Sequence, residues 1–285
     1  MVSVIIPTLA EAQRMESLRR AIRSAESKTS TVVVCVNGSS SSADCITHLK
    51  SLENVKLLNL PEASLPRARA AGRQAVQTPF FTFLDDDDEL LPGGLERRLA
   101  VLTSRPDIDL VITNGWRRQG GRQEVMLNQL ASVSADPLLA LFRENWLPSC
   151  GATFRTSSIG PEYFADMHGY AEWTWLAFRL SLDKKRVEVI DDITFAINDT
   201  PGSLSKSANY RAAYLHLYRR MLEVNPPDSV RKQIKRKISS FWHDLSAESL
   251  ARGDLRRATW YHVRSLLSHG GLRYLAYTRH LAIRR

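Results

Sequence analysis

The chain has 285 residues, of which 44% are hydrophobic and 24% charged, a globular composition that excludes the disordered and fibrous classes. Its net charge of +9 is uneven, because residues 206–285 carry 17 Lys and Arg against 5 Asp and Glu, whereas residues 1–205 carry 22 against 25. A mildly acidic body thus precedes a strongly basic tail, which points to an anionic partner for the tail, either a membrane surface or a polyanion.

Neither a membrane span nor a signal peptide is expected. The longest stretch without charge or histidine, residues 29–43, is half polar and falls short of the roughly 20 apolar residues that a spanning helix needs. The first residues lack a basic region, and Pro7 interrupts their apolar run. The three cysteines are scattered (Cys35, Cys45 and Cys150) and indicate neither a disulfide framework nor a zinc site. We therefore expect a cytoplasmic protein.

The first 113 residues alternate strand and helix patterns. Apolar or β-branched runs predict strands at 2–6, 31–36, 55–58, 80–84 and 108–113. Helices are predicted through Leu18, Ile22 and Ala25, over 43–52, over 66–76 and from Pro92 onward. Strands separated by helices of this length imply right-handed crossovers and a mostly parallel sheet with helices on both faces.

The rest of the chain divides in two. Beyond Asn114 the alternation weakens, and we predict a mixed extension of the same sheet that ends in a strand at 187–197. Residues 206–285 look helical, with one apolar face formed by Ile234, Ile238, Phe241, Trp242 and Leu245. We predict a catalytic domain over 1–205, with halves 1–113 and 114–205, and a basic helical extension over 206–285.

Four consecutive aspartates, Asp85 to Asp88, follow the hydrophobic strand at 80–84. In an extended segment alternate residues point the same way, so Asp85 and Asp87 should converge while Asp86 and Asp88 face the other side. Two carboxylates at the carboxyl end of a strand suit Mg²⁺ or Mn²⁺ and leave coordination positions for phosphate oxygens. The alternatives are a solvated acidic loop and carboxylates that favour the N-terminus of the helix after Pro92. The cost of four like charges beside an apolar strand favours the metal.

Four motifs together resemble one enzyme family. They are residues 2–8 (VSVIIPT), Asn37-Gly38-Ser39, Ala68-Arg69 with Gly72, and residues 83–88 (FLDDDD). In this order and spacing they resemble the family 2 glycosyltransferases of GT-A fold, over roughly residues 2–205. The resemblance implies an α/β fold with a mixed, mostly parallel sheet. It also implies transfer of a sugar from a nucleotide diphosphate sugar to an acceptor, usually with inversion.

The resemblance also implies roles for individual residues. Those expected at the donor nucleotide are Pro7, Thr8, Asn37, Arg69, Asp85 and Asp86. Asp87 would hold the Mn²⁺ or Mg²⁺ that bridges the diphosphate. Without the family, Arg69 reads as a surface arginine of an amphipathic helix, and Thr8 reads as a cap of the following helix.

An inverting transfer needs a base that accepts the proton of the attacking hydroxyl. The family places this carboxylate in a Glu-Asp-Trp type motif that opens a helix, and Glu172 occupies the aspartate position here, while Ala171 replaces the first acid. Glu172 is therefore the expected base. The alternative is a first-turn glutamate stabilised by the helix dipole, which is worth roughly 0.3–1 kcal/mol.

Three further residues are candidates for acceptor or phosphate contacts, namely His168, Trp175 and Asp199. A polar loop position explains His168 equally well, and partial burial explains Trp175. Trp173 shares a helix face with Leu176 and Leu180 and is expected in the core.

The sequence also departs from the family pattern at three places. Val36 stands where an acid often reads the base, Ala70 where an Asn often follows the arginine, and Thr200 where a His often precedes Pro201. These departures leave the donor base open.

The tail supports a membrane partner. Five cations flank an apolar stripe that includes Phe241 and Trp242; they are Arg231, Lys232, Lys235, Arg236 and Lys237. Such helices lie on anionic lipid. The alternative is a packed helical subdomain with a solvated basic face, and both can hold together.

We therefore expect a metal-dependent glycosyltransferase of cell-envelope polysaccharide synthesis, peripheral on the inner face of the cytoplasmic membrane, with a glycan or lipid-linked acceptor. One alternative is a non-catalytic GT-A-like protein that binds a polyanion or a membrane through its tail. Nucleic acid is not an expected partner, because the basic helices lack an interleaved aromatic surface. Sugar-phosphate nucleotidyl transfer is disfavoured because residues 7–14 lack a Gly-rich signature.

Overall fold

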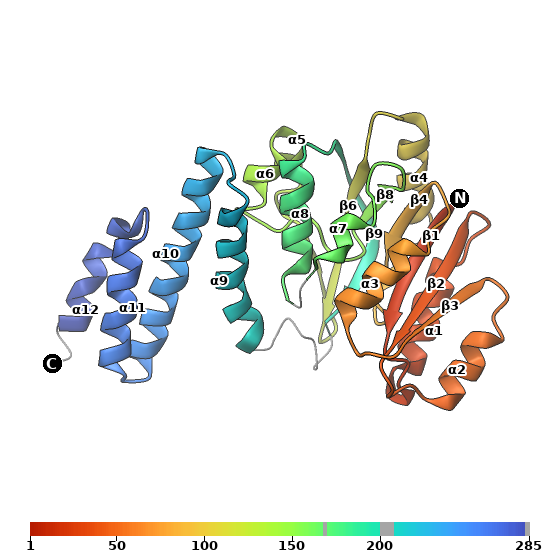
Figure 1. Ribbon diagram of the computed structural model, residues 1–285, viewed down its shortest axis with the longest axis horizontal. Coiled ribbons are helices and arrows are strands. Elements are labelled where there is room, and N and C mark those ends of the chain that lie inside the picture. Colours follow the sequence, from red (N-terminus) through yellow and green to blue (C-terminus); the bar gives the residue numbers. More distant parts are fainter. Residues whose placement is uncertain (168–169, 200–207, 283–285) are drawn as a thin grey trace. The chain divides into compact units, whose positions relative to one another are not determined.

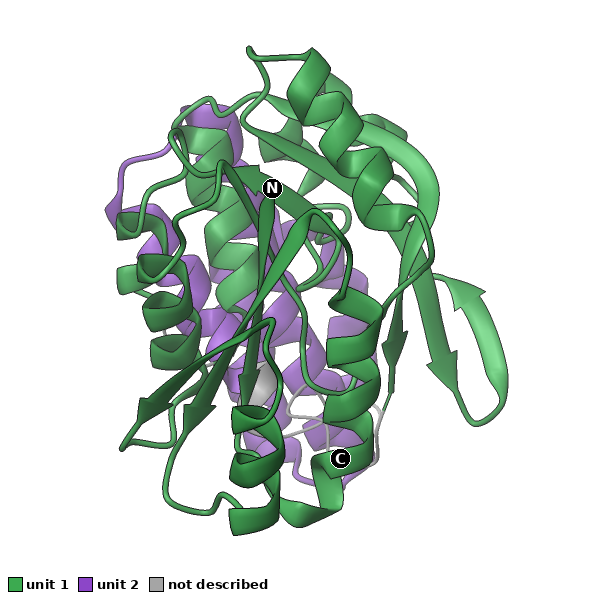
Figure 2. Cartoon of the chain, turned by 90° about the vertical axis from the view of Figure 1, so that its right-hand side faces the viewer, with its two compact units in different colours: residues 1–206 green, residues 207–285 purple. Residues whose placement is uncertain are grey.

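A computed structural model of the chain describes residues 1–167, 170–199 and 208–282. The chain divides into two compact units, residues 1–206 and residues 207–285, coloured green and purple in Figure 2. The strands of unit 1 are β1 (Val2–Thr8), β2 (Ser30–Asn37), β3 (Val55–Leu60), β4 (Phe80–Phe83), β5 (Glu89–Leu90), β6 (Leu110–Gln119), β7 (Arg122–Val125), β8 (Ala152–Arg155) and β9 (Val187–Asn198). Its helices are η1 (Ala12–Arg14), α1 (Met15–Ala25), α2 (Ala43–Lys50), α3 (Leu65–Gln74), α4 (Gly94–Ser104), α5 (Ala131–Ala135), α6 (Pro137–Ala140), α7 (Glu162–Ala165) and α8 (Glu172–Leu182) (Figure 1).

The described residues of unit 1 form one nine-stranded sheet in the order β3-β2-β1-β4-β8-β6-β9-β5, with β7 paired to β6. The strands β3, β2, β1 and β4 are mutually parallel. Strand β8 is antiparallel to both β4 and β6, and β9 is parallel to β6, so six of these nine strands run in one direction. The predicted mixed, mostly parallel sheet is confirmed.

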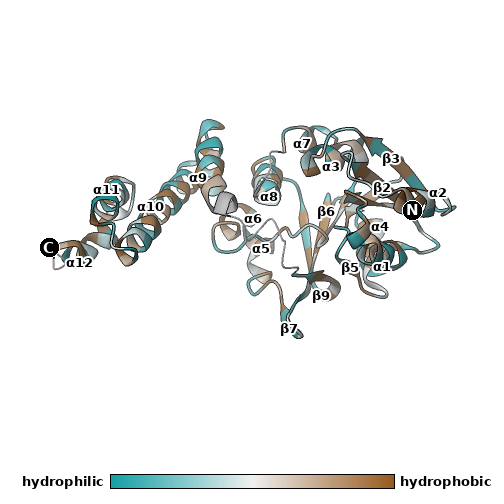
Figure 3. Cartoon of the chain, turned by 90° about the horizontal axis from the view of Figure 1, so that it is seen from below, coloured by the Kyte–Doolittle hydropathy of each residue, from teal (hydrophilic) through white to brown (hydrophobic). Residues whose placement is uncertain are grey.

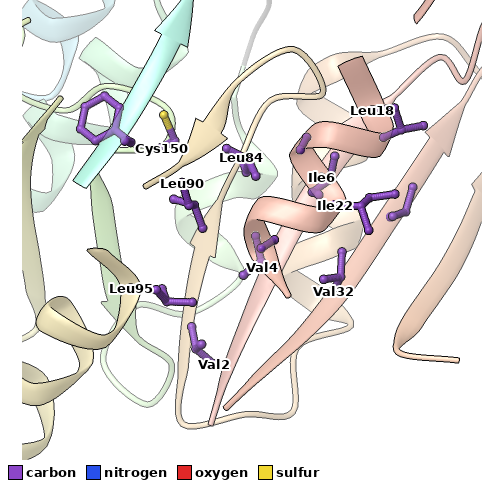
Figure 4. Close-up of a cluster of buried hydrophobic side chains, with 14 of the residues drawn as sticks. Val2, Val4, Ile6, Leu18, Ile22, Val32, Leu84, Leu90, Leu95 and Cys150 are labelled. Atoms are coloured by element: carbon purple, nitrogen blue, oxygen red, sulfur yellow. The ribbon is translucent and has the colours of Figure 1, made fainter. Parts of the chain in front are cut away.

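One face of this sheet packs against α1 and α4. Alternate residues of β1 (Val2, Val4 and Ile6) join Leu18 and Ile22 of α1 in a single buried cluster (Figure 4). Leu95, Leu99 and Leu102 of α4 extend the same cluster. The strand at residues 2–6 and the helix through Leu18, Ile22 and Ala25 that the sequence predicted are therefore present as β1 and α1.

The opposite face is built from aromatic rings. Phe81 and Phe83 of β4 contact Phe154 of β8, with ring centroids 5.0 and 6.5 Å away. Phe164 of α7 and Trp173 of α8 close over Phe83 at 5.2 and 5.3 Å. This cluster sets α8, and with it the first residue of α8, beside the carboxyl end of β4.

Unit 2 consists of α9 (Ala208–Glu223), α10 (Asp228–Ala251), α11 (Leu255–Leu267), η3 (Gly271–Tyr277) and α12 (Thr278–Ala282). Helices α10 and α11 approach closely through small residues, because the buried Ser239 hydroxyl donates to the Ser265 carbonyl at 3.0 Å and Ser246 donates to Ala258 at 2.7 Å. No helix among the described residues is both long and apolar enough to cross a bilayer.

The predicted elements correspond closely to the observed ones, with two differences. The helix expected from Pro92 begins at Gly94, because Gly93 adopts a left-handed conformation at φ 74° and interrupts the chain there. The strand expected over 108–113 continues to Gln119 as β6 and turns back through Gly120 and Gly121 into β7.

Candidate active site

The four aspartates connect β4 to β5 at the carboxyl ends of the parallel strands. The expectation of an extended segment is wrong, because Asp86 and Asp87 form a turn that the Asp88 amide closes by donating to the Asp85 carbonyl at 3.1 Å. Asp85 and Asp87 are nevertheless partly exposed while Asp86 and Asp88 are buried. Within the turn Asp85 pairs with Arg69 and Asp87 pairs with Arg14.

The two buried aspartates tie the turn to neighbouring strands. Asp86 accepts a hydrogen bond from the Thr8 hydroxyl at 2.6 Å, at the end of β1. Asp88 accepts from the amide of Asn198, the last residue of β9, at 3.0 Å, and the Asn198 side chain donates to the Asp87 carbonyl at 2.6 Å. These contacts fix the turn between β1 and β9.

Burial makes the ionised form of both side chains costly. It raises the pKa of Asp86 to about 6, although the Thr8 hydroxyl and the Arg14 guanidinium act in the opposite direction. It also raises the pKa of Asp88 well above its ordinary value, together with the nearby charges of Asp85 and Asp87. Ionisation of these two carboxyls therefore costs free energy, and a nearby cation lowers that cost.

Arg14 is one such cation, and the sequence analysis missed it. Its guanidinium lies 3.2 Å from an Asp86 oxygen and 2.9 Å from an Asp87 oxygen. The short 3-10 turn Ala12–Arg14 after β1 delivers it there. The available signal was a basic residue close behind the first strand, but the spacing alone does not indicate the direction of its side chain.

Arg69 is a buried cation between two carboxylates. Its side chain is only 2% exposed, so the alternative of a surface arginine is wrong. One terminal nitrogen lies 2.8 Å from Asp85, and the other pairs with Glu172. Burial alone would lower the pKa of Arg69, but the two carboxylates raise it, so the guanidinium stays charged. Its plane also faces the Trp173 ring at 4.9 Å.

Glu172 is the first residue of α8, as the family motif implied. The two residues before it, Tyr170 and Ala171, both have left-handed backbones at φ 69° and 56°. Such conformations cost about 1–2 kcal/mol each for residues other than glycine, and they persist where the surroundings impose them. The backbone is therefore bent sharply to present the Glu172 side chain to Arg69. His168 lies outside the described residues.

Three donor-side residues at the strand ends are buried. Pro7 is part of β1, and Thr8 donates to Asp86 and accepts from the Ala10 amide at 2.9 Å, so it does not cap a helix. The Asn37 side chain donates to the Thr8 carbonyl and accepts from the Ser64 amide, both at 2.9 Å. Asn37 thus braces the end of β1 against the start of α3.

Trp175, a candidate for an acceptor or phosphate contact, is buried, as the alternative reading of this residue expected. Trp175 is 3% exposed, stacks on Phe178 at 5.8 Å and donates to Asp166 at 3.3 Å. Trp173, expected in the core, is instead only partly buried and lies beside Arg69. Asp199 directly follows Asn198, and its amide donates to the Arg118 carbonyl at 2.9 Å.

The residues of the aspartate turn fit a hard divalent cation by their chemistry, because carboxylate oxygens are the ligands such ions prefer. Asp85 and Asp87 are the partly exposed members. In the part of the chain that the structure describes, no group of three or more His, Cys, Asp and Glu residues is arranged to hold a metal alone. A cation here would therefore need further ligands from a bound phosphate compound.

A family model, "Glycosyl transferase family 2", matches residues 3–164, which is more than half of the chain and includes Thr8, Arg69 and the aspartate turn. The chain belongs to this family. A search of curated protein sequences gives no significant match.

Solved structures of S. aureus TarS resemble the structure of this chain. S. aureus TarS 1–349 in complex with UDP-GlcNAc aligns with a TM-score of 0.62 at 13% identity, over 93% of this chain and 90% of that chain. The same TarS fragment in complex with UDP aligns at 0.56 and 14% identity, with the same coverage. A structure of the same fragment without a named ligand aligns with a TM-score of 0.59 at 16% identity, over 89% of this chain and 74% of that chain. At these identities the likeness concerns the fold, and it confirms the expected GT-A architecture of this family 2 chain.

Proposed function

We propose that this family 2 glycosyltransferase moves a sugar from a nucleotide diphosphate sugar to a hydroxyl of a glycan or lipid-linked acceptor, with inversion. The observation that carries the proposal is the ion-paired row Asp85–Arg69–Glu172. The buried guanidinium of Arg69 pairs with two acids. Asp85 lies at the edge of the sheet where α/β proteins bind ligands, and Glu172 lies at the start of α8. Arg69 therefore brings the proposed donor-side acid, Asp85, and the proposed base, Glu172, close to each other.

The donor nucleotide is proposed to lie at the carboxyl ends of β1, β2 and β4, where Thr8 and Asn37 end β1 and β2 and Asp85 follows β4. TarS, which shares the fold, is described in complexes with UDP and UDP-GlcNAc, so a uridine donor is the first to test. Val36 stands where the family often has an acid that reads the base, which is the reason to test other bases beside it.

Asp87 is the residue we propose to hold a divalent cation, with Asp85 beside it on the donor side. A cation bound to the diphosphate would supply Lewis-acid stabilisation of the leaving group. Arg14 already pairs with Asp87. It is therefore placed to share the carboxylate with the cation or to turn toward a phosphate.

Glu172 is proposed as the general base. The acceptor oxygen forms a bond to the anomeric carbon, the bond from that carbon to the diphosphate breaks, and the hydroxyl proton passes to the Glu172 carboxylate. The guanidinium of Arg69 is the ion-pair partner of the Glu172 carboxylate. It also holds the carboxylate in one orientation.

Two buried donors lie unused at this place. Within the described residues neither the Arg69 Nε nor the Trp173 Nε1 has a hydrogen-bond partner. Buried N–H groups without partners are costly, and bound oxygen atoms would satisfy them. Hydroxyl groups of a sugar are suitable acceptors, which supports a carbohydrate ligand beside Glu172.

The donor site is tested by thermal denaturation with UDP, GDP, CDP and dTDP, each with and without Mn²⁺. A true ligand at about 100 times its Kd should raise the Tm by roughly 5–10 °C. We expect a Mn²⁺-dependent shift with one nucleotide, which disappears in Asp87→Asn and persists in Asp192→Asn, a surface control. No shift with any nucleotide would contradict the proposed donor site and would favour a non-catalytic protein.

The base is tested separately with Glu172→Gln. This variant should keep the nucleotide-dependent Tm shift and lose at least about a hundredfold in kcat, because the proton then has no acceptor. Glu96→Gln, on the surface of α4, serves as the matched control. NMR of the sugar product reports the anomeric configuration, and retention would contradict direct displacement.

A further inference from the structure

We propose that α11 and η3 of unit 2 form a docking surface for an anionic lipid bilayer. This inference does not depend on the proposed sugar transfer, because it concerns unit 2 alone. Five exposed large apolar side chains make up the surface, which we call the α11–η3 surface: Trp260, Val263, Leu267, Leu272 and Leu275.

These residues are concentrated in a short segment. Of the eight large apolar side chains exposed among the described residues, five lie between positions 260 and 275. Leu267 is 83% exposed and Trp260 is 51% exposed. Single exposed apolar residues are normal on soluble proteins, whereas a cluster of this kind marks an interaction site.

Their spacing places them on common faces. Val263 and Leu267 follow Trp260 by three and seven residues in α11. This spacing puts the three side chains on one side of the helix. Leu272 and Leu275 are three apart in η3, which is one turn of a 3-10 helix. Hydrophobic and hydrophilic residues lie beside one another along α10 and α11 (Figure 3).

The surface has a cationic border. Arg256 and Arg264 stand four residues before and after Trp260, so each is its neighbour on α11. The Arg264 guanidinium lies 4.3 Å from the centre of the Trp260 ring and 5.0 Å from that of Trp242. A tryptophan with an arginine beside it suits the boundary between lipid headgroups and acyl chains.

The charge of the segment identifies the partner. Residues 252–282 contain six arginines and one aspartate, and that aspartate, Asp254, is used to cap α11 by accepting from the Arg257 amide at 2.9 Å. A second copy of the chain would bring these positive charges together, which disfavours a self-interface. A nucleic acid would pair with the arginines but would leave the leucines without a partner. An anionic bilayer accommodates both.

This surface differs from the one that the sequence suggested. Two members of the apolar stripe of α10, Ile234 and Trp242, are buried in unit 2, and Trp242 stacks on Tyr261 at 5.7 Å. The other three, Ile238, Phe241 and Leu245, are partly buried. Among the described residues of unit 2, the five most exposed large apolar side chains belong to α11 and η3.

The test is co-sedimentation of the full chain with vesicles of phosphatidylcholine, with and without phosphatidylglycerol, at low and high salt. We expect retention on the anionic vesicles at low salt, and weaker retention on neutral vesicles or at high salt. Leu267→Ser should weaken retention about tenfold or more, because the leucine, exposed in the free chain, would be buried in the bilayer on binding. Val125→Ser, which replaces an exposed apolar residue of β7 in unit 1, should leave retention unchanged.

The charge is tested in the same way. Arg256→Glu should weaken retention roughly 30-fold at low salt, whereas Arg97→Glu on the surface of α4 should change it little. Circular dichroism of each variant verifies folding. Absence of retention on anionic vesicles at low salt overturns the proposal, as does equal retention of Leu267→Ser and the parent. Self-association that Leu267→Ser abolishes, without vesicle binding, would assign the surface to a second copy instead.

Discussion

The side chain of Asp86 illustrates how charge and burial compete at this site. It is buried between Thr8 and Arg14, and its pKa is raised to about 6 from an ordinary 3.8. A carboxyl whose folded-state pKa is raised stabilises the fold fully at pH values below the unfolded-state pKa. That stability is lost as the pH rises through the folded-state value of about 6.

Asp86→Asn removes this titration and keeps an oxygen for the Thr8 hydroxyl. Without nucleotide or divalent cation, we expect the parent to lose on the order of 3 kcal/mol of unfolding free energy from this group between pH 4 and pH 8. The variant should lack that component, and urea denaturation at several pH values measures the difference. Asp192→Asn, on the surface, is the control. Parallel pH profiles of the parent and Asp86→Asn would contradict the assignment.

Arg14 should oppose the binding of a metal cation, because its guanidinium lies 2.9 Å from the Asp87 carboxylate. We expect Arg14→Gln to bind Mn²⁺ alone about fivefold more tightly, since a partly exposed like charge contributes about 1 kcal/mol. Electron paramagnetic resonance of free Mn²⁺ measures the affinity. Arg23→Gln, an exposed arginine of α1, is the matched control. Weaker Mn²⁺ binding by Arg14→Gln would contradict this arrangement.

At the scale of elements, the approach of α3 to the sheet depends on Gly72. A Cβ atom at this position would lie 2.3 Å from Cγ2 of Ile5 in β1 and 2.9 Å from Sγ of Cys35 in β2. Helix α3 carries Arg69 one turn earlier, so its distance from the sheet also sets the position of the guanidinium.

Gly72→Ala should therefore destabilise unit 1 by about 1–3 kcal/mol through overpacking, although alanine is the better helix former. It should also weaken nucleotide binding by shifting Arg69. Chemical denaturation and the nucleotide-dependent Tm shift measure the two effects. The control is the same change in an Ile5→Ala background, where the cost should shrink because the Cγ2 atom is absent. An equal cost in both backgrounds would contradict the packing argument.

Some helices and strands were easier to predict from the sequence than others. The β-branched run of β1 was legible because the strand is buried along its whole length, and the helical spacing of α1 was legible because that helix has one buried face. Helix α8 was less legible, since Thr174, Trp175, Leu176 and Phe178 are all buried and the helix has no single apolar face. Periodicity therefore could not distinguish Trp173 from Trp175.

The site was predictable in its residue types but not in its connections. The family motifs indicated Asp85, Arg69 and Glu172 separately. They did not indicate that Arg69 pairs with both acids, because Glu172 is 103 residues away from Arg69 along the chain. The turn at Asp86 and Asp87 was missed because the aspartates were treated as a continuation of the strand, although aspartate itself favours turns. Arg14 and Asn198 were missed because only the sheet brings their elements to the aspartates.

At the scale of the whole molecule, the two units should separate in function. All described candidate site residues lie in unit 1, and the five apolar residues of the α11–η3 surface lie in unit 2. We expect a chain of residues 1–206 to keep the metal- and nucleotide-dependent Tm shift and to lose retention on anionic vesicles. Loss of both, in a truncated chain that still melts cooperatively, would contradict this division.

The opposite charges of the two units have a consequence for the approach to a surface. Unit 1 is close to −3 over residues 1–205, and the remainder of the chain is close to +12. A negatively charged plane attracts unit 2 and weakly repels unit 1 over about one Debye length, roughly 10 Å at 0.1 M salt. Unit 2 would therefore be drawn toward such a plane before any of its atoms make contact, and its encounters with the plane would be more frequent than diffusion alone allows.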